Sequence, residues 1–279
     1  MLIGIVNDPH YGFAGMHSRK VHERFSQLIA DKIGELDVRA FIVAGDIATS
    51  RQAEIEAFFK LYKSKISVPF MCVFGNHDYW DEKGGPLPNG RYGQRQASQL
   101  FRLHEELCEK YGVHYLGSGD MVIDDVRFCG YDGWYKHVDV QTRDLEHMVQ
   151  MIEGAPAHLY MNDRAHKDCG RVLLSAERAK ENKLVCVSHF DSVPVNGEGH
   201  IYGGDISQFY ALSERFDLVI YGHSHKRHDL KVNRAHFVSP GGGYDDPTLL
   251  IYDLEAGRIH SFHKLSWTKR HPRDTPELK

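Results

Sequence analysis

The first third of the chain alternates short apolar runs with segments in which apolar residues recur at helical spacing. Leu2 to Val6 and Ala40 to Ala44 are apolar runs of strand length, and between them apolar residues stand three or four positions apart. A second helical segment, Gln52 to Lys63, leads to a third apolar run, Phe70 to Phe74. This order predicts consecutive βαβ units around a mostly parallel sheet, that is, an α/β fold.

The middle of the chain has a less regular pattern. Residues 81–93 are rich in glycine, proline and charge and predict a surface loop, followed by a helix at about Gln94 to Tyr111. A helical, histidine-rich stretch is predicted near Val140 to Ile152, and we interpret residues 132–170 as an insertion or lid. Short strands are predicted at Val113 to Leu116, Met121 to Ile123 and Val126 to Tyr131.

The last third returns to the alternation of the first. Helices are predicted around Val172 to Glu181 and Ile206 to Arg215. The predicted strands are Leu184 to Ser188, Leu218 to Tyr221, a short strand near Phe237, Leu249 to Tyr252 and Ile259 to Phe262. No internal repeat, low-complexity tract or linker divides the sequence, so we expect residues 1–279 to form a single domain that contains the insertion.

Composition narrows the class of protein. With 34 Lys+Arg against 38 Asp+Glu, the formal net charge of -4 gives no electrostatic reason to expect nucleic acid or a membrane surface as a partner. The five cysteines are odd in number and stand mostly in apolar runs, which is typical of buried thiols in a reducing compartment. We expect no signal peptide, and no apolar run approaches membrane-spanning length. We therefore expect a cytoplasmic protein, whose oligomeric state these patterns leave open.

Five clusters of residues that can bind metal each follow an apolar run predicted to be a strand. In an open α/β sheet the loops after the carboxyl ends of the strands meet at one rim, so residues far apart in sequence converge there. A single histidine or aspartate is usually a solvated residue, but five clusters in this placement indicate a site. The clusters are Asp8-Pro9-His10, Gly45-Asp46, Gly75-Asn76-His77-Asp78, Ser188-His189 and Gly222-His223-Ser224-His225.

In these five blocks, and in their order, the sequence resembles the calcineurin-like metallophosphoesterases. The family pattern is Asp-x-His, Gly-Asp, Gly-Asn-His-Asp/Glu, a lone His and Gly-His-x-His, and the resemblance covers about residues 3–240. It implies a four-layer α-β-β-α sandwich of two mixed sheets flanked by helices. It also implies a metal-dependent phosphoester hydrolase.

The resemblance further implies a role for each matching residue. Asp46 would bridge two divalent ions, whose net charge of about +2 with the two carboxylates attracts phosphate. The ions would hold a bridging hydroxide for in-line attack on phosphorus. The first ion would be bound by Asp8, His10, Asp46 and His225, and the second by Asp46, Asn76, His189 and His223.

His77 is the motif histidine that these ligand sets leave out. The resemblance makes it the catalytic residue that assists the leaving-group oxygen or stabilises the transition state, and the neighbouring Asp78 is a candidate for orienting an imidazole. A mixture of imidazole and carboxylate ligands suits Mn, Fe or Zn, and we favour Mn.

Other residues near the motifs are candidates for contacting the substrate. Aromatic rings there can stack on a base, and arginines can bind a second phosphate, although aromatic rings are more often core packing and arginines more often solvated. The candidates are Asn76, Tyr79, Trp80, Arg91, Arg95 and Trp134.

Departures from subfamily patterns narrow the expected substrate. Protein phosphatases of the family extend the second block to Gly-Asp-x-x-Asp-Arg-Gly, whereas this chain has Ala48, Thr49 and Ser50 after Ile47. Purple acid phosphatases have a tyrosine where this chain has Thr49. Repair nucleases add a DNA-capping domain, for which little sequence remains after residue 265. We therefore expect a phosphodiesterase acting on a small, nucleotide-like molecule; the alternatives are a phosphomonoesterase or protein phosphatase, a nuclease, and a non-catalytic scaffold.

Overall fold

A computed structural model of the chain describes two sheets of six strands each, a short two-stranded sheet and the helices that cover them. The described residues are 1–12, 18–48, 52–80, 97–136, 151–152, 155–193, 203–241 and 247–265. Within these ranges, no helix has both the length and the apolar composition needed to cross a bilayer.

The first sheet has the strand order β14-β13-β1-β2-β3-β4. Its four N-terminal strands run parallel, as the βαβ pattern predicted, and β13 joins β1 antiparallel. The strands are β1 (Leu2–Val6), β2 (Val38–Ala44), β3 (Phe70–Val73), β4 (His114–Tyr115), β13 (Thr248–Asp253) and β14 (Arg258–Lys264).

The second sheet has the order β11-β12-β10-β9-β6-β5. Its four central strands are parallel, and antiparallel strands close both edges. The strands are β5 (Met121–Ile123), β6 (Val126–Tyr131), β9 (Lys183–Ser188), β10 (Leu218–Ile220), β11 (His228–Val232) and β12 (Ala235–Ser239). Both sheets are therefore mixed.

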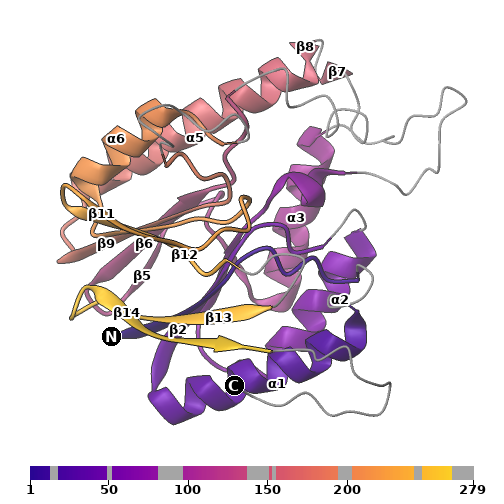
Figure 1. The fold of residues 1–279 in the computed structure, drawn as a ribbon. Coiled ribbons are helices and arrows are strands. Elements are labelled where there is room, and N and C mark those ends of the chain that lie inside the picture. The colour runs from indigo at the N-terminus through magenta and orange to yellow at the C-terminus, as the bar shows by residue number, and fades with distance from the viewer. Residues whose placement is uncertain are drawn as a thin grey trace, which may run out of the picture.

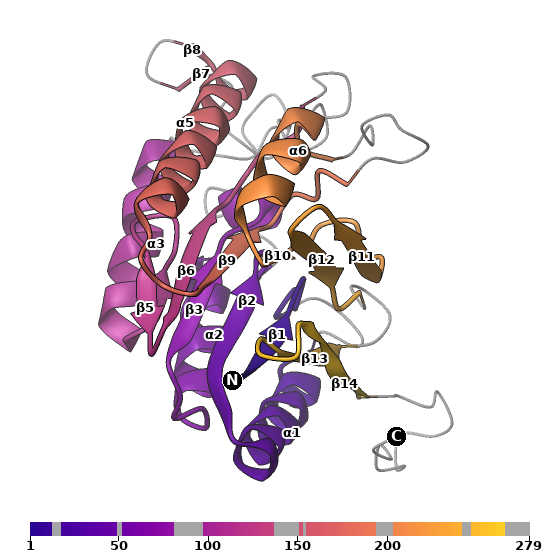
Figure 2. The same cartoon turned by 90° about the vertical axis from the view of Figure 1, so that its left-hand side faces the viewer.

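The two sheets pack face to face between two layers of helices (Figure 1). In the view turned by 90°, α5 and α1 again lie on opposite sides of the sheets (Figure 2). The predicted four-layer α-β-β-α sandwich is thus confirmed. The first helical layer holds α1 (Arg19–Leu36), α2 (Gln52–Lys63) and α3 (Ala97–Tyr111), and the second holds α5 (Ala157–Arg178) and α6 (Ile206–Arg215).

Strand β2 shows why the parallel strands read as continuous apolar runs. Because successive side chains point to opposite faces of a strand, Ala40 and Ile42 pack between the sheets, whereas Phe41 and Val43 pack against the helices. Both faces are buried, so almost every position is apolar. The carboxyl ends of these strands remain as the place where polar side chains gather.

The structure corrects the prediction for the region before β9. The helix expected from Val172 begins at Ala157, so residues 157–170, which we assigned to an insertion or lid, are the first part of α5, and this helix packs against β6 and α6. Its buried stripe includes Met161, Ala165 and Cys169, which are too weakly apolar to give a clear helical period.

Two further differences concern a segment end and a sheet edge. Met151–Ile152, predicted as the end of a helix, is strand β7, which pairs with β8 (Ala155–Pro156). Residues 137–150 and the loop predicted at 81–93 lie outside the described residues. Strand β11 was not predicted, because it is an edge strand whose side chains are largely polar and exposed.

Candidate metal centre

Seven side chains predicted to bind metal lie in loops at the carboxyl ends of five strands. The first sheet contributes the loops after β1, β2 and β3, and the second sheet contributes the loops after β9 and β10. Because the sheets face each other, the loops meet at one end of the sandwich. The side chains are Asp8, His10, Asp46, Asn76, His189, His223 and His225.

Four of these residues form what we call the first donor group: Asp8, His10, Asp46 and His225. Each offers one nitrogen or oxygen, and these atoms lie within 4.8 Å of one another. His10 Nε2 is 3.7 Å from Asp46 Oδ2 and 3.3 Å from His225 Nε2. His225 Nε2 is 3.6 Å from Asp8 Oδ1. Carboxylate oxygens and imidazole nitrogens thus point at a common centre.

The second donor group consists of Asp46, Asn76, His189 and His223. Donor atoms of the aspartate and the two histidines again lie within 4.8 Å of one another. The Asn76 Oδ1 atom is 3.1 Å from His189 Nε2 and 3.1 Å from His223 Nδ1. Asp46 therefore belongs to both groups, with Oδ2 facing His10 and Oδ1 facing His189.

A backbone carbonyl sets the orientation of the His189 ring. His189 Nδ1 lies 3.0 Å from the Ala44 oxygen, and since a carbonyl can only accept, Nδ1 carries the proton and donates. Nε2 is then left with its lone pair facing the centre. Burial lowers the pKa of His189 well below its ordinary value, so the ring is held in the neutral form that can bind a metal.

The buried carboxylates give the strongest indication of a cation. Asp8 is fully buried, and burial raises the pKa of its carboxyl although the His223 N–H and the Asn7 amide donate hydrogen bonds to it. A buried negative charge is costly without a positive partner. Two such carboxylates facing several imidazoles form a donor set that fits divalent cations.

The backbone at the centre adopts an uncommon conformation. Five of the seven residues have φ between 44° and 65°, in the left-handed region that residues other than glycine rarely occupy. The surrounding loops stabilise this arrangement, for example through the hydrogen bond from the His10 N–H to the Asp46 carbonyl, at 2.9 Å. The five residues are Asp8, His10, Asp46, His223 and His225.

Two motif glycines are required by close approach to the donor residues. A Cβ atom at Gly75 would lie 2.1 Å from Asp46 Oδ1 and 2.7 Å from His189 Cε1. Gly45 has a φ of +81°, and a Cβ there would lie 2.3 Å from His189 Nδ1. Any side chain at either position would displace the donors.

His77 lies beside the two donor groups in the short 3-10 helix η2 (Asn76–Tyr79). Its backbone N–H donates to Asp46 Oδ1 at 3.0 Å, and its Nε2 is 4.0 Å from Asp46 Oδ2. Its ring centroid is 3.7 Å from that of Trp80 and 4.8 Å from that of His10. The imidazole is 13% exposed and is held between two rings at the edge of the centre.

Asp78 does not orient an imidazole through its carboxylate, contrary to the hypothesis from its place in the motif. Its Oδ1 accepts a hydrogen bond from the Ala48 N–H at 2.9 Å, and its Oδ2 accepts from Ile47 at 3.1 Å and Gly75 at 2.8 Å. Burial raises its pKa to about 7 despite these bonds. The residue ties the loop after β2 to the loop after β3.

The residues predicted to contact substrate lie in different environments. Tyr79 and Trp134 are 1% and 3% exposed and belong to the apolar core; that they contact substrate stays a prediction. Trp80 packs on His77, next to the centre, and Asn76 is a member of the second donor group. Arg91 and Arg95 lie outside the described residues.

Some residues near the centre were not found by the sequence analysis. Asn7 donates to Asp8 Oδ2 at 2.6 Å, and the Tyr135 ring lies 5.0 Å from that of His223. Asp132 follows β6 and accepts hydrogen bonds from several neighbours. Its position directly after a strand is the same signal that identified the donors, but it stands alone there without a histidine.

Known proteins share this fold. A model of the calcineurin-like phosphoesterase family matches residues 1–227. No curated protein sequence matches the chain. Phosphopantetheinyl hydrolase from Mycobacterium tuberculosis is 14% identical, with a TM-score of 0.59 over 99% of this chain and 98% of that one.

Two other solved structures have similar folds. A protein named as a 5′-nucleotidase, from Staphylococcus aureus, is 14% identical with a TM-score of 0.56, and the match covers 92% of this chain but 52% of that one. A dimetal phosphatase from Danio rerio is 12% identical with a TM-score of 0.53, over 90% and 95% of the two chains. The family match covers most of the sequence, and we conclude that this chain belongs to the calcineurin-like phosphoesterases and is a metal-dependent hydrolase of phosphate esters.

Proposed function

We propose that the chain is a phosphodiesterase for a small, nucleotide-like substrate and that its two donor groups bind two divalent ions, with Asp46 bridging them. The observation that carries this proposal is the shared position of Asp46, whose two carboxylate oxygens face different groups. When bound, the ions supply Lewis acidity and an activated water for attack on phosphorus. Manganese is our first choice of metal, because the donors are imidazoles and oxygens and the five cysteines are buried elsewhere.

In this proposal His77 is the residue that acts on the leaving group. Its side chain is close to Asp46 without belonging to either donor group, a position that suits an imidazole donating a proton to the departing oxygen. Trp80 and His10 restrict the ring to one orientation. A fixed donor at the edge of the centre can stabilise developing charge without first rearranging.

The substrate class is tested by comparing a model diester with a model monoester. Metal-stripped protein reloaded with Mn²⁺, Fe²⁺ or Zn²⁺ is assayed on bis-p-nitrophenyl phosphate and p-nitrophenyl phosphate. We expect the higher kcat/KM on the diester and the highest activity with Mn²⁺. Preference for the monoester would replace the proposal with a phosphomonoesterase, and no turnover with any metal would favour a binding scaffold.

The assigned roles are tested by two substitutions. Asp46→Ala is expected to abolish turnover and to lower the metal content, because both donor groups lose a ligand. His77→Ala is expected to keep both ions and to lower kcat about 10²-fold to 10⁴-fold, the usual contribution of a general acid. Metal content is measured by mass spectrometry of the dialysed protein.

A matched control tests whether removing any imidazole from the protein has the effects expected for His77→Ala. His166 lies on α5 with its side chain 59% exposed and is paired with Asp205 at 3.4 Å. His166→Ala is expected to leave kcat and metal content unchanged. Wild-type turnover in His77→Ala would exclude the proposed catalytic role.

A further inference from the structure

Asp132 is a buried aspartate directly after β6 and belongs to neither donor group. Its Oδ1 accepts a hydrogen bond from the Phe74 N–H at 2.8 Å. Its Oδ2 accepts from the Tyr115 hydroxyl at 2.5 Å and from the Tyr79 hydroxyl. The Asp132 carboxylate thus accepts three hydrogen bonds, which come from the residue after β3, from β4 and from η2.

The backbone of the same residue reaches the loop after β9, which belongs to its own sheet. The Asp132 carbonyl accepts a hydrogen bond from the N–H of His189, at 3.2 Å. His189 is itself a donor residue, and the carbonyl of Ala44 already fixes its ring. The Asp132 carbonyl therefore helps to position the His189 backbone, whereas the Ala44 carbonyl sets the orientation of the His189 ring.

These contacts lie beside two members of the second donor group, Asn76 and His189. Phe74 precedes Asn76 and Tyr79 follows it, so the Asp132 carboxylate holds the η2 turn on both sides of the Asn76 ligand. The carbonyl holds His189, which lies 3.1 Å from Asn76 Oδ1. One buried residue thereby links two donors that come from different sheets.

We propose that Asp132 is a positioning residue for the second metal site and sets the separation between Asn76 and His189. The inference rests on the proposed two-metal function. Residues that orient metal ligands through hydrogen bonds typically change metal affinity about 10-fold to 100-fold when removed. The first donor group is expected to be independent of Asp132, because Asp8, His10 and His225 lie on the loops after β1 and β10.

The test is a titration of metal-stripped protein with Mn²⁺ by calorimetry, which requires no turnover. Asp132→Ala is expected to weaken one of two sites about 10-fold or more. Asp132→Asn keeps an oxygen for the Phe74 N–H and is expected to weaken the same site less. If the alanine variant does not fold, the asparagine variant carries the test.

Two backgrounds identify which site is affected. In His225→Ala, where the first group is incomplete, adding Asp132→Ala is expected to weaken the remaining site. In His189→Ala, where the second group is incomplete, adding the same change is expected to have no further effect. An equal effect of Asp132→Ala in both backgrounds would overturn the assignment to the second site.

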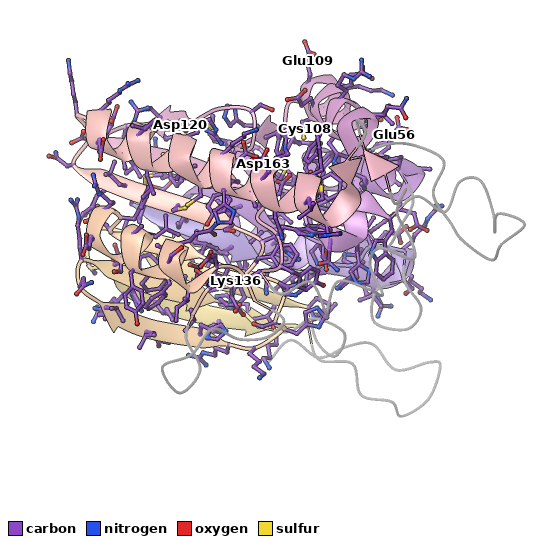
Figure 3. All side chains as sticks on the ribbon, turned by 90° about the horizontal axis from the view of Figure 1, so that it is seen from above. Glu56, Cys108, Glu109, Asp120, Lys136 and Asp163 are labelled. Atoms are coloured by element: carbon purple, nitrogen blue, oxygen red, sulfur yellow. The ribbon has the colours of Figure 1, made fainter. Side chains whose placement is uncertain are left out.

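Asp120 provides a matched control for loss of a hydrogen-bonded carboxylate. It lies beside α5, where it accepts hydrogen bonds from Ser175 and from Arg171 (Figure 3). Asp120→Ala is expected to lower thermal stability without changing either Mn²⁺ affinity. If both Mn²⁺ affinities are unchanged in Asp132→Ala and in Asp132→Asn, the inference about Asp132 is overturned and the proposed function is not. If the wild-type protein binds fewer than two ions, the proposed function itself is overturned.

Discussion

At the scale of single residues, buried hydrogen bonds fix the strained loop after β1. His22 is fully buried on α1, with Nε2 2.9 Å from the Pro9 carbonyl oxygen and Nδ1 2.8 Å from the Tyr62 hydroxyl. A carbonyl can only accept, so Nε2–H donates to Pro9 and Nδ1 accepts from Tyr62. Because Pro9 stands between Asp8 and His10, these two hydrogen bonds help to hold the backbone that carries both residues of the first donor group.

We predict that Tyr62→Phe lowers the free energy of unfolding by about 1 to 3 kcal/mol, because His22 Nδ1 would lose its buried donor. The measurement is urea unfolding of metal-stripped protein. Tyr111→Phe is the matched control, since its hydroxyl bonds to Glu56 in a partly buried position, and it is expected to change stability by less than about 0.5 kcal/mol. Equal stabilities of the two variants would contradict the supporting role of the bond.

At the scale of secondary-structure elements, α5 and the second sheet enclose three thiols. Cys129 on β6, Cys169 on α5 and Cys186 on β9 belong to one apolar core cluster. Burial raises the pKa of Cys129 to about 12 and that of Cys169 to about 11. These thiols are therefore protonated near neutral pH, which makes them poor nucleophiles.

We predict that iodoacetamide at about pH 8 modifies none of these three cysteines until the protein is unfolded. Because their pKa values are higher in the folded state, their contribution to stability is intact below about pH 8.5 and is lost as the pH rises toward about 11. Mass spectrometry of the alkylated protein checks the first expectation, and urea unfolding at increasing pH checks the second. Rapid alkylation of the folded protein would contradict the buried placement.

A double variant isolates the contribution of these thiols to the alkaline loss of stability. Cys129→Ala combined with Cys169→Ala removes two of the raised pKa values. Its stability is expected to depend less steeply on pH above about 8.5 than that of the wild type.

At the scale of the whole molecule, the candidate centre joins the two sheets. Asp8, Asp46 and Asn76 come from loops of the first sheet, whereas the histidines after β9 and β10 come from the second. In the metal-free protein, the apolar cluster between the sheets and hydrogen bonds such as that from Phe74 to Asp132 hold the two halves together. Bound ions would add a link at the end of the sandwich where buried carboxylates weaken it.

We predict that Mn²⁺ at about 100 times its Kd stabilises the fold by about 2.7 kcal/mol per site and raises the Tm by about 5 °C or more. Scanning calorimetry with Mn²⁺ and with EDTA measures the difference. Asp46→Ala is expected to lose most of this gain, while the exposed-site variant His166→Ala should keep it. A Tm that does not respond to metal would argue against a centre that bridges the sheets.

Local pattern predicted much of the fold. The bounds of α2 and α6 were predicted as observed, because their apolar residues follow a clear helical period and their ends are marked by polar residues. Within the described residues, the start of α5 was badly misplaced, since its buried stripe uses alanine, cysteine and methionine. The edge strand β11 has only Leu230 and Val232 as apolar residues, too few to stand out as a strand pattern.

The sequence by itself determined the class of chemistry, because the donors stand in short blocks directly after apolar strands and this placement is local. Tertiary structure alone decided which neighbouring side chains face the centre. Tyr79 turns into the core toward Asp132, Asp78 binds backbone N–H groups, and His22 reaches Pro9. The contacts of Tyr79 with Asp132 and of Asp78 with Ala48 join residues 53 and 30 positions apart. The direction of a buried side chain depends on the hydrogen-bond partner that the packed fold offers it.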